Sequence, residues 1–260
     1  MQKKKIVIIL TTLVVLAIAF LSVATVFRVR GVTVETAVIS EVAKDEAKAL
    51  QERLLKAYKN DSSFSVKDKK AKEIMEEFPY FRLTGFERAY PDRIVVSVAE
   101  HVESYAVKKA DSEEYYIIGE DGLILSIRES SLNRLDGSPN VIIEGEGLSV
   151  SGEKGQKLVG DAKWNALLQF CNYFSEKVNG LRDNVTTVTV SKYAPEYCLT
   201  TREGVKIYVG TPETLTLEKS EAAVEKYLSL TDAERMKGMI MVESKDGEVI
   251  VSYYNKDFKG

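Results

Sequence analysis

The 260-residue sequence predicts an α+β protein with a single N-terminal transmembrane helix and two domains after it. Three observations carry this prediction. Residues 6–27 are apolar and uncharged, residues 28–103 read as strand, helix, helix, strand and strand, and residues 104–260 contain mostly short strands separated by turns. A chain of this kind forms a compact α/β module followed by a β-rich domain that ends in a hairpin.

The run Ile6–Phe27 is predicted to cross a membrane. As a helix it would measure about 33 Å, enough for a hydrocarbon core about 30 Å thick. Residues 3–5 are lysines, so the positive-inside rule places residues 1–5 in the cytoplasm and the domains outside it. A cleaved signal peptide, cut after Ser22-Val23-Ala24, is the alternative. It is disfavoured because the run exceeds the usual apolar length of about 7–15 residues.

Residues 28–103 are predicted to form the first domain, with both helices on one face of a sheet. The expected elements are a strand near 29–34, helices at 40–58 and 66–78, and strands at 80–88 and 93–100. Ser40 is a suitable helix N-cap, and Pro79 ends the second helix because it disfavours helix in the residue before it. The expected core residues are Leu50, Leu54, Ile74, Phe78, Val96 and Val98.

Residues 104–260 are predicted to form the second domain. Its expected strands lie at 115–118, 123–125, 185–190, 197–201, 205–209, 239–243 and 249–254, and its helices at 161–178 and 217–230. Glu120-Asp121-Gly122 and Lys245-Asp246-Gly247 are hairpin turn signals. The last of these turns makes residues 239–254 a C-terminal hairpin.

Composition and motifs argue against catalysis and against nucleic-acid binding. The 36 basic and 39 acidic residues give no basic surplus. His101 is the only histidine, no Gly-x-Ser-x-Gly motif occurs, and the neighbouring carboxylates at 76–77 and 113–114 point apart on a helix or strand. We therefore expect a protein that is not an enzyme and has no metal or cofactor site. Cys171 and Cys198 are either buried free thiols, which we favour slightly, or a disulfide.

The order of elements and several motifs resemble the FtsQ/DivIB family of cell-division proteins. The most specific stretch runs from Phe78-Pro79-Tyr80-Phe81 through Tyr90-Pro91-Asp92-Arg93 to Val98. It resembles the helix end, Phe-Pro, strand, turn and strand of the family's POTRA domain. Further similar positions lie in the second domain: Tyr115–Ile118 with Asp121-Gly122, and Leu199–Thr201 with Gly204, Gly210 and Lys219.

The resemblance implies a POTRA-like domain at 28–103 and a β domain at 104–260. It also implies a non-catalytic divisome protein of the bacterial cell membrane, located at the midcell septum. Its expected partners are DivIC/FtsB-like and FtsL-like single-pass proteins, and through them the septal peptidoglycan synthases FtsW and FtsI. Met241-Val242-Glu243 departs from the family's Asp-x-Arg pattern, so the partner surface cannot be transferred residue by residue. The alternative function is a membrane-anchored envelope module that binds peptidoglycan or secreted substrates.

The last strand is the candidate partner-binding site. Its residues are Val249, Ile250, Val251, Ser252, Tyr253 and Tyr254. An edge strand leaves backbone N–H and C=O groups unpaired, and an extended partner segment can add there. An internal strand, paired on both sides, is the alternative. Replacing Ser252 by proline is expected to abolish partner binding if the Ser252 N–H points outward.

Overall fold

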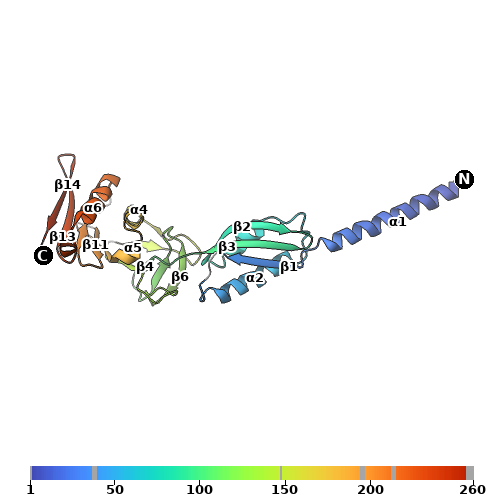
Figure 1. Ribbon diagram of the computed structural model, residues 1–260, viewed down its shortest axis with the longest axis horizontal. Helices are drawn as coiled ribbons and strands as arrows, with labels where there is room; N and C mark the ends of the chain where they lie inside the picture. The colour runs from blue at the N-terminus through green and yellow to red at the C-terminus, as the bar shows by residue number, and fades with distance from the viewer. Residues whose placement is uncertain (1, 37–39, 147, 194–196, 212–214, 256–260) are drawn as a thin grey trace. The chain divides into compact units, whose positions relative to one another are not determined.

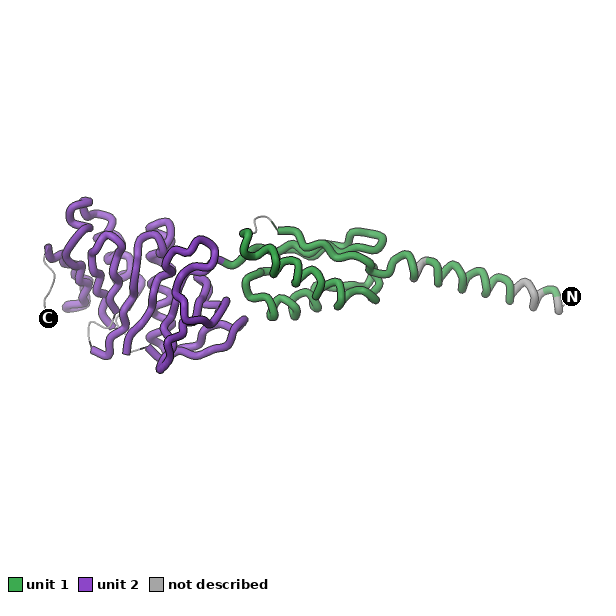
Figure 2. The backbone as a smooth tube through the Cα atoms, turned by 90° about the horizontal axis from the view of Figure 1, so that it is seen from below, with its two compact units in different colours: residues 1–101 green, residues 102–260 purple. Residues whose placement is uncertain are grey.

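The computed structural model describes residues 2–36, 40–146, 148–193, 197–211 and 215–255. Over these residues the chain is mixed α+β, with seven helices and fourteen strands (Figure 1). It divides into two compact units, Met1–His101 and Val102–Gly260 (Figure 2). The predicted division, between residues 103 and 104, lies close to this boundary.

The N-terminal segment forms helix α1, Gln2–Val26. None of the helices, as far as their residues are described, has the length and apolar character that crossing a membrane requires. This finding contradicts the predicted membrane span over 6–27 with its cytoplasmic tail at 1–5. It equally contradicts the predicted location, a single-pass protein of the bacterial cell membrane at the septum.

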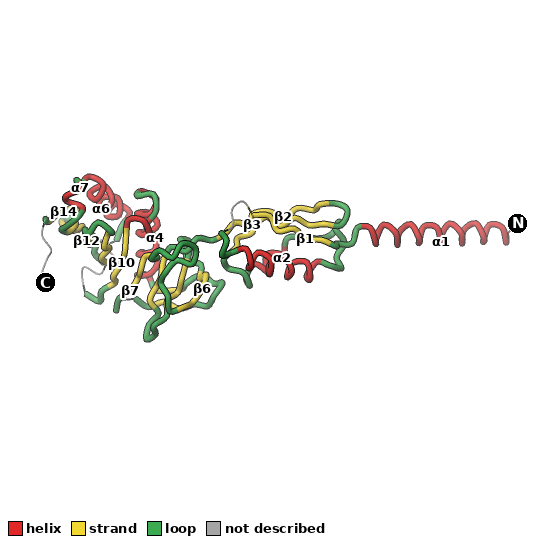
Figure 3. Tube along the Cα trace, turned by 60° about the horizontal axis from the view of Figure 1, so that its bottom comes forward, coloured by secondary structure: helices red, strands yellow, loops and turns green. Residues whose placement is uncertain are grey.

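Unit 1 contains a three-stranded sheet with two further helices. The elements are β1 (Gly31–Thr36), α2 (Lys44–Tyr58), α3 (Lys69–Met75), β2 (Phe81–Ala89) and β3 (Arg93–Glu100). The strand order is β1-β3-β2, with β1 parallel and β2 antiparallel to the central strand β3. This is the predicted order of strand, helix, helix, strand and strand, and Figure 3 shows α2 running along the sheet.

The core of unit 1 forms because apolar residues recur every second position in the strands and every fourth position in α2. Leu50, Leu54 and Tyr58 of α2 are buried against Ile94, Val96 and Val98 of β3. Of the predicted core residues, Phe78 is only partly buried but packs on the same cluster. The hydroxyl of Tyr58 donates to the Lys67 carbonyl (2.8 Å) and accepts from the Ala71 N–H (2.9 Å), which joins α2 to the start of α3.

Replacing Leu54 by alanine is expected to lower the free energy of unfolding of unit 1 by about 2–5 kcal/mol, because a buried side chain leaves a cavity. Lys69→Ala is the control, since Lys69 is 84% exposed and its pair with Glu73 spans 3.9 Å. Hydrogen exchange of the backbone amides of β1, β2 and β3, measured in the full chain, reports the free energy of unfolding of unit 1. Equal exchange in the two variants would show that the core face of α2 has been misassigned.

Unit 2 is organised around a nine-stranded sheet in the order β14-β13-β12-β11-β10-β7-β4-β5-β6. Its strands are β4 (Tyr105–Lys108), β5 (Tyr115–Ile118), β6 (Ile124–Arg128), β7 (Val141–Glu144), β10 (Val185–Val190), β11 (Tyr197–Thr201), β12 (Lys206–Tyr208), β13 (Met239–Lys245) and β14 (Glu248–Tyr254). A separate short pair is formed by β8 (Val150–Ser151) and β9 (Val159–Gly160). The helices are α4 (Ala162–Lys177), α5 (Leu181–Asn184), α6 (Leu217–Ser229) and α7 (Asp232–Arg235).

Helices α4 and α6 supply the apolar cover of one face of this sheet (Figure 3). Asp161 caps α4 by accepting from the Trp164 N–H, and Thr216 caps α6 by accepting from the Lys219 N–H. Trp164, Phe170 and Phe174 of α4 and Tyr227 of α6 belong to one buried cluster. The strand residues in that cluster include Val107, Ile143, Val188, Leu199, Ile207, Ile240 and Val242. Their alternation along each strand leaves the intervening side chains on the opposite face.

A buried ion pair stabilises the β6 end of the sheet. The Glu103 side chain is 2% exposed and accepts from both terminal nitrogens of Arg128, at 3.0 and 2.7 Å. The same carboxylate accepts from the Arg134 N–H (3.1 Å) and from the Asn140 side-chain amide (3.2 Å). Glu103 therefore connects the start of β4 to β6 and to the loop that leads to β7.

Removing the cationic partner by Arg128→Ala is expected to lower the free energy of unfolding of unit 2 by about 3 kcal/mol or more, because it leaves a buried carboxylate without its counter-charge. Lys109→Ala is the matched control, since its 3.0 Å pair with Glu114 is far more exposed (36% and 41%) than Glu103 and surface pairs contribute about 0–1 kcal/mol. Urea unfolding measures the free energy of unfolding of both variants, and it can be followed by tryptophan fluorescence because Trp164 lies in this core. Similar midpoints would contradict the assigned role of Glu103.

Candidate functional site

The predicted partner strand lies at the edge of the nine-stranded sheet. Strand β14 is the terminal strand and pairs with β13 alone over the described residues. The register runs from Lys245 opposite Glu248 to Met239 opposite Tyr254. In the described part of the sheet, β14 is therefore an edge strand and not an internal strand paired on both sides. Whether a partner binds there is a separate matter.

The turn between β13 and β14 determines which backbone groups face outward. It consists of two residues, Asp246 (φ 54°) and Gly247 (φ 85°), and positive φ at both positions is typical of a type I′ hairpin turn. In such a hairpin the residues flanking the turn, Lys245 and Glu248, exchange both backbone hydrogen bonds, and every second pair repeats this. The even-numbered residues of β14 thus bond to β13.

The odd-numbered residues Val249, Val251 and Tyr253 therefore direct their N–H and C=O groups away from the sheet. The position of the Tyr254 carbonyl agrees with this phase, because a Cβ at Gly238, next to β13, would lie 2.3 Å from that oxygen. The Ser252 N–H belongs to the β13 ladder. The condition on which Ser252→Pro was to abolish binding, an outward N–H, is therefore not met at Ser252, and Val251 meets it because the two-residue turn sets the alternation.

The side chains of β14 divide between the two faces of the sheet. Val249, Val251 and Tyr253 are partly buried and pack on the cluster under α4 and α6. Ile250 is 40% exposed and Tyr254 is 47% exposed, and they share the opposite face with Ser252. An added strand would therefore meet both an apolar, helix-covered side and an open side.

Tyr253 anchors the end of β14 to the segment before β13. Its hydroxyl lies 3.1 Å from the carbonyl oxygens of Glu234 and Lys237, either of which can accept its proton. Burial, and secondarily the Glu234 carboxylate, raise the pKa of Tyr253. Gly238 (φ 90°) makes room for this ring, because a Cβ there would lie 3.2 Å from the Tyr253 hydroxyl oxygen.

The other exposed edges are protected in ways that β14 is not. At β6, the Ile124 N–H donates to the Gln156 carbonyl (2.8 Å) and the Ile124 carbonyl accepts from the Gly155 N–H (2.9 Å), so a loop pairs with the first residue of that edge. In unit 1, β2 has a register shift between Leu83 and Gly85 and carries exposed charges, and β1 carries exposed Glu35. Bulges and charges both discourage strand addition.

The segment Met241-Val242-Glu243 lies in β13, beside the candidate strand. Met241 pairs with Ser252 and Glu243 with Ile250. Lys219 of α6 is 2% exposed, and burial lowers the pKa of its ammonium while the charge of Glu243 opposes that shift. Glu243 therefore supplies electrostatic support for a buried lysine in the helix that covers β13 and β14.

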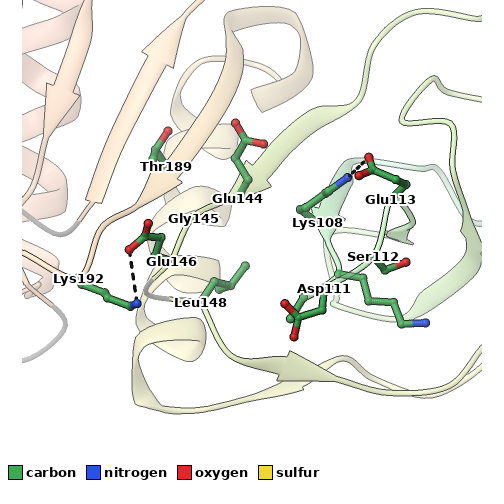
Figure 4. A pocket seen from close by; sticks show the side chains of 12 residues that line it. Lys108, Asp111, Ser112, Glu113, Glu144, Gly145, Glu146, Leu148, Thr189 and Lys192 are labelled. Atoms are coloured by element: carbon green, nitrogen blue, oxygen red, sulfur yellow. Dashed lines mark hydrogen bonds and ion pairs between the residues drawn. The ribbon is translucent and has the colours of Figure 1, made fainter.

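A groove of about 780 Å³ opens at the carboxyl ends of the parallel strands β4, β7 and β10 (Figure 4). Its charged residues form ion pairs at the surface, Lys108 with Glu113 (3.0 Å) and Lys192 with Glu146 (3.4 Å). Lys108 is 28% exposed, whereas the side chains of Glu113, Lys192 and Glu146 are mostly exposed, so these ion pairs lie largely in solvent.

The remaining candidates for chemistry are His101 in unit 1 and the two cysteines in unit 2. His101 follows β3, and its backbone N–H donates to the Tyr80 carbonyl (2.8 Å). Both cysteines are free, with Cys171 buried in α4 and Cys198 partly buried in β11, and burial raises the pKa of each thiol, that of Cys171 to about 12. Within the described ranges, no three His, Cys, Asp or Glu residues gather as metal ligands would.

No protein-family profile matches the chain, and no curated protein matches its sequence.

Replacing Gly238 by alanine is expected to destabilise unit 2 by several kcal/mol, because the new Cβ would collide with the Tyr254 carbonyl at a positive φ. Gly137→Ala is the matched control, because Gly137 also has a positive φ (71°) but nothing lies within 4 Å of its Cβ position. That variant should lose only about 1 kcal/mol. Thermal unfolding compares the two, and equal losses would contradict the tight fit of Tyr253 and Tyr254 against Gly238.

Proposed function

We propose that this protein is a non-catalytic subunit of the bacterial cell-division machinery that binds an extended segment of a DivIC/FtsB-like partner on β14. Together with an FtsL-like protein, this complex would regulate septal peptidoglycan synthesis by FtsW- and FtsI-type enzymes. The observation that carries the binding proposal is the open edge of β14. The identity of the partner rests on the sequence resemblance alone.

The edge supplies the two components that strand addition needs. Val249, Val251 and Tyr253 offer outward N–H and C=O groups, which give affinity in any extended segment. Specificity comes from side chains that alternate between two faces, one lined by Ile250 and Tyr254 and the other lying next to the apolar core. A partner with alternating apolar residues suits this arrangement.

The site chemistry supports a binding role rather than catalysis. The pKa values of Tyr58, Tyr105 and Tyr227 are raised mainly by burial, as is that of Cys171, and these side chains are packing elements. Such shifts disfavour the charged form, so these groups stay neutral at physiological pH. Tyr105, Cys171 and Tyr227 belong to the core of the sheet from which β14 extends, and Tyr58 belongs to the core of unit 1.

The test is a proline at an outward N–H compared with a side-chain control. Val251→Pro removes the Val251 N–H and should abolish capture of the DivIC-like protein of the same organism, with only a modest loss of stability. Val251→Ala removes more of the side chain than Val251→Pro does but keeps the N–H, so it should retain most of the binding. Ser252→Pro breaks the β13 ladder instead and should unfold the hairpin.

Pull-down and circular dichroism on the same preparations separate these outcomes. Full binding by a folded Val251→Pro variant would overturn strand addition on β14. Equal loss of binding in Val251→Pro and Val251→Ala would show that side-chain packing, and not the backbone ladder, carries the interaction.

A further inference from the structure

The open edge of β14 is self-complementary. Long, apolar edge strands pair with one another unless charges, prolines or bulges prevent it. Strand β14 contains no proline and no lysine, and its one charged residue is Glu248, next to the turn. Among the described residues nothing covers its outer side. We propose that, when no partner occupies it, β14 pairs antiparallel with β14 of a second copy of this chain, about a two-fold axis at Val251.

The alternation of backbone groups selects this axis. A two-fold axis at Val251 places Val251 opposite Val251 of the second copy, and Val249 opposite Tyr253. All of these residues direct their N–H and C=O groups outward, so each opposed pair can exchange two backbone hydrogen bonds. An axis at Val249 or at Tyr253 would oppose β14 with the turn or with residues beyond the strand. Only the Val251 axis uses the whole edge.

The side chains brought together by this axis are compatible on both faces. On the core-facing side Val249 lies opposite Tyr253, a β-branched and aromatic pair of the kind that stabilises sheets. On the open side Ile250 lies opposite Ser252, and Glu248 lies opposite Tyr254. No like charges oppose each other, so the register contains no electrostatic penalty.

The assembly closes at two copies. A two-fold interface uses the same surface on both chains, which leaves neither β14 edge free. The far edge of each sheet, β6, is covered at Ile124 by the loop that contains Gly155 and Gln156. With both β14 edges used in the interface, the product is a dimer.

Self-pairing needs only the edge geometry and goes beyond the proposed function. If the proposed function also holds, the second copy and the partner compete for the same three outward residues. Partner binding would then release monomers. The two ideas are measured separately, one on the chain alone and one with the partner present.

Disulfide trapping tests the register. Ile250 and Ser252 of the second copy form a pair without mutual hydrogen bonds, with Cα atoms about 4.5 Å apart, inside the range of about 4.4–6.8 Å for disulfides. In full-length protein carrying Cys198→Ser, Ile250→Cys and Ser252→Cys variants are oxidised alone and as a mixture. We expect covalent dimer mainly in the mixture. Equal cross-linking in the single variants and the mixture would overturn the Val251 axis.

Analytical ultracentrifugation of the chain alone tests the dimer itself. The wild type should show a concentration-dependent equilibrium of monomer and dimer, with Val251→Pro shifted to monomer and Val251→Ala retaining the dimer. A wild type that stays monomeric, a Val251→Pro variant that still dimerises, or species larger than a dimer would overturn the proposal. Loss of partner capture with an intact dimer would instead count against the proposed function.

Discussion

The two-residue turn at Asp246-Gly247 is the constraint on which the candidate site depends. Positive φ at both residues gives the hairpin its type I′ geometry, and that geometry decides which residues of β14 bond to β13. If this loop had one more residue, the Val251 N–H would bond to β13 and the Ser252 N–H would point outward. The apolar side chains of β14 would then also turn away from α6. The chemistry of the edge is thus determined at the tip of the hairpin.

The far end of β14 is held by different means. Tyr253 reaches the carbonyls of Glu234 and Lys237, and α7 presents one of them because Thr231 and Glu234 form a capping box. Gly238 completes this arrangement by leaving space for the tyrosine ring. Turn geometry and side-chain anchoring together keep a strand extended although only one neighbour pairs with it.

Strongly periodic segments could be predicted from the sequence, and short ones could not. The strands at 93–100, 115–118, 185–190 and 197–201 and the helix after Asp161 lie within a residue of their expected bounds. Strands Tyr105–Lys108 and Val141–Glu144 were missed: each has only four residues, and neither precedes a turn signal such as the Asp121-Gly122 that follows Tyr115–Ile118. The N-terminal helix exists, but the membrane span inferred from its composition is contradicted.

Part of the candidate site could also be predicted from the sequence. The edge position of residues 249–254 followed from a hairpin with few neighbours, whereas the direction of the Ser252 N–H was left as a condition. The signal was present, since Asp-Gly between two strands is a strong indicator of a two-residue type I′ turn. The protective loop at β6 could not have been foreseen, because Gly155 and Gln156 are distant in sequence from the strands they meet.

The hydrogen bonds that join β14 to the rest of the sheet also determine how the hairpin responds to a pulling force. A pull along β14 loads its bonds to β13 in shear, so that many must break together. A pull at the turn peels them one pair at a time. The Tyr253 anchor strengthens the end far from the turn, so unzipping starts at Asp246-Gly247. The hairpin therefore resists tension along the strand far better than tension across it.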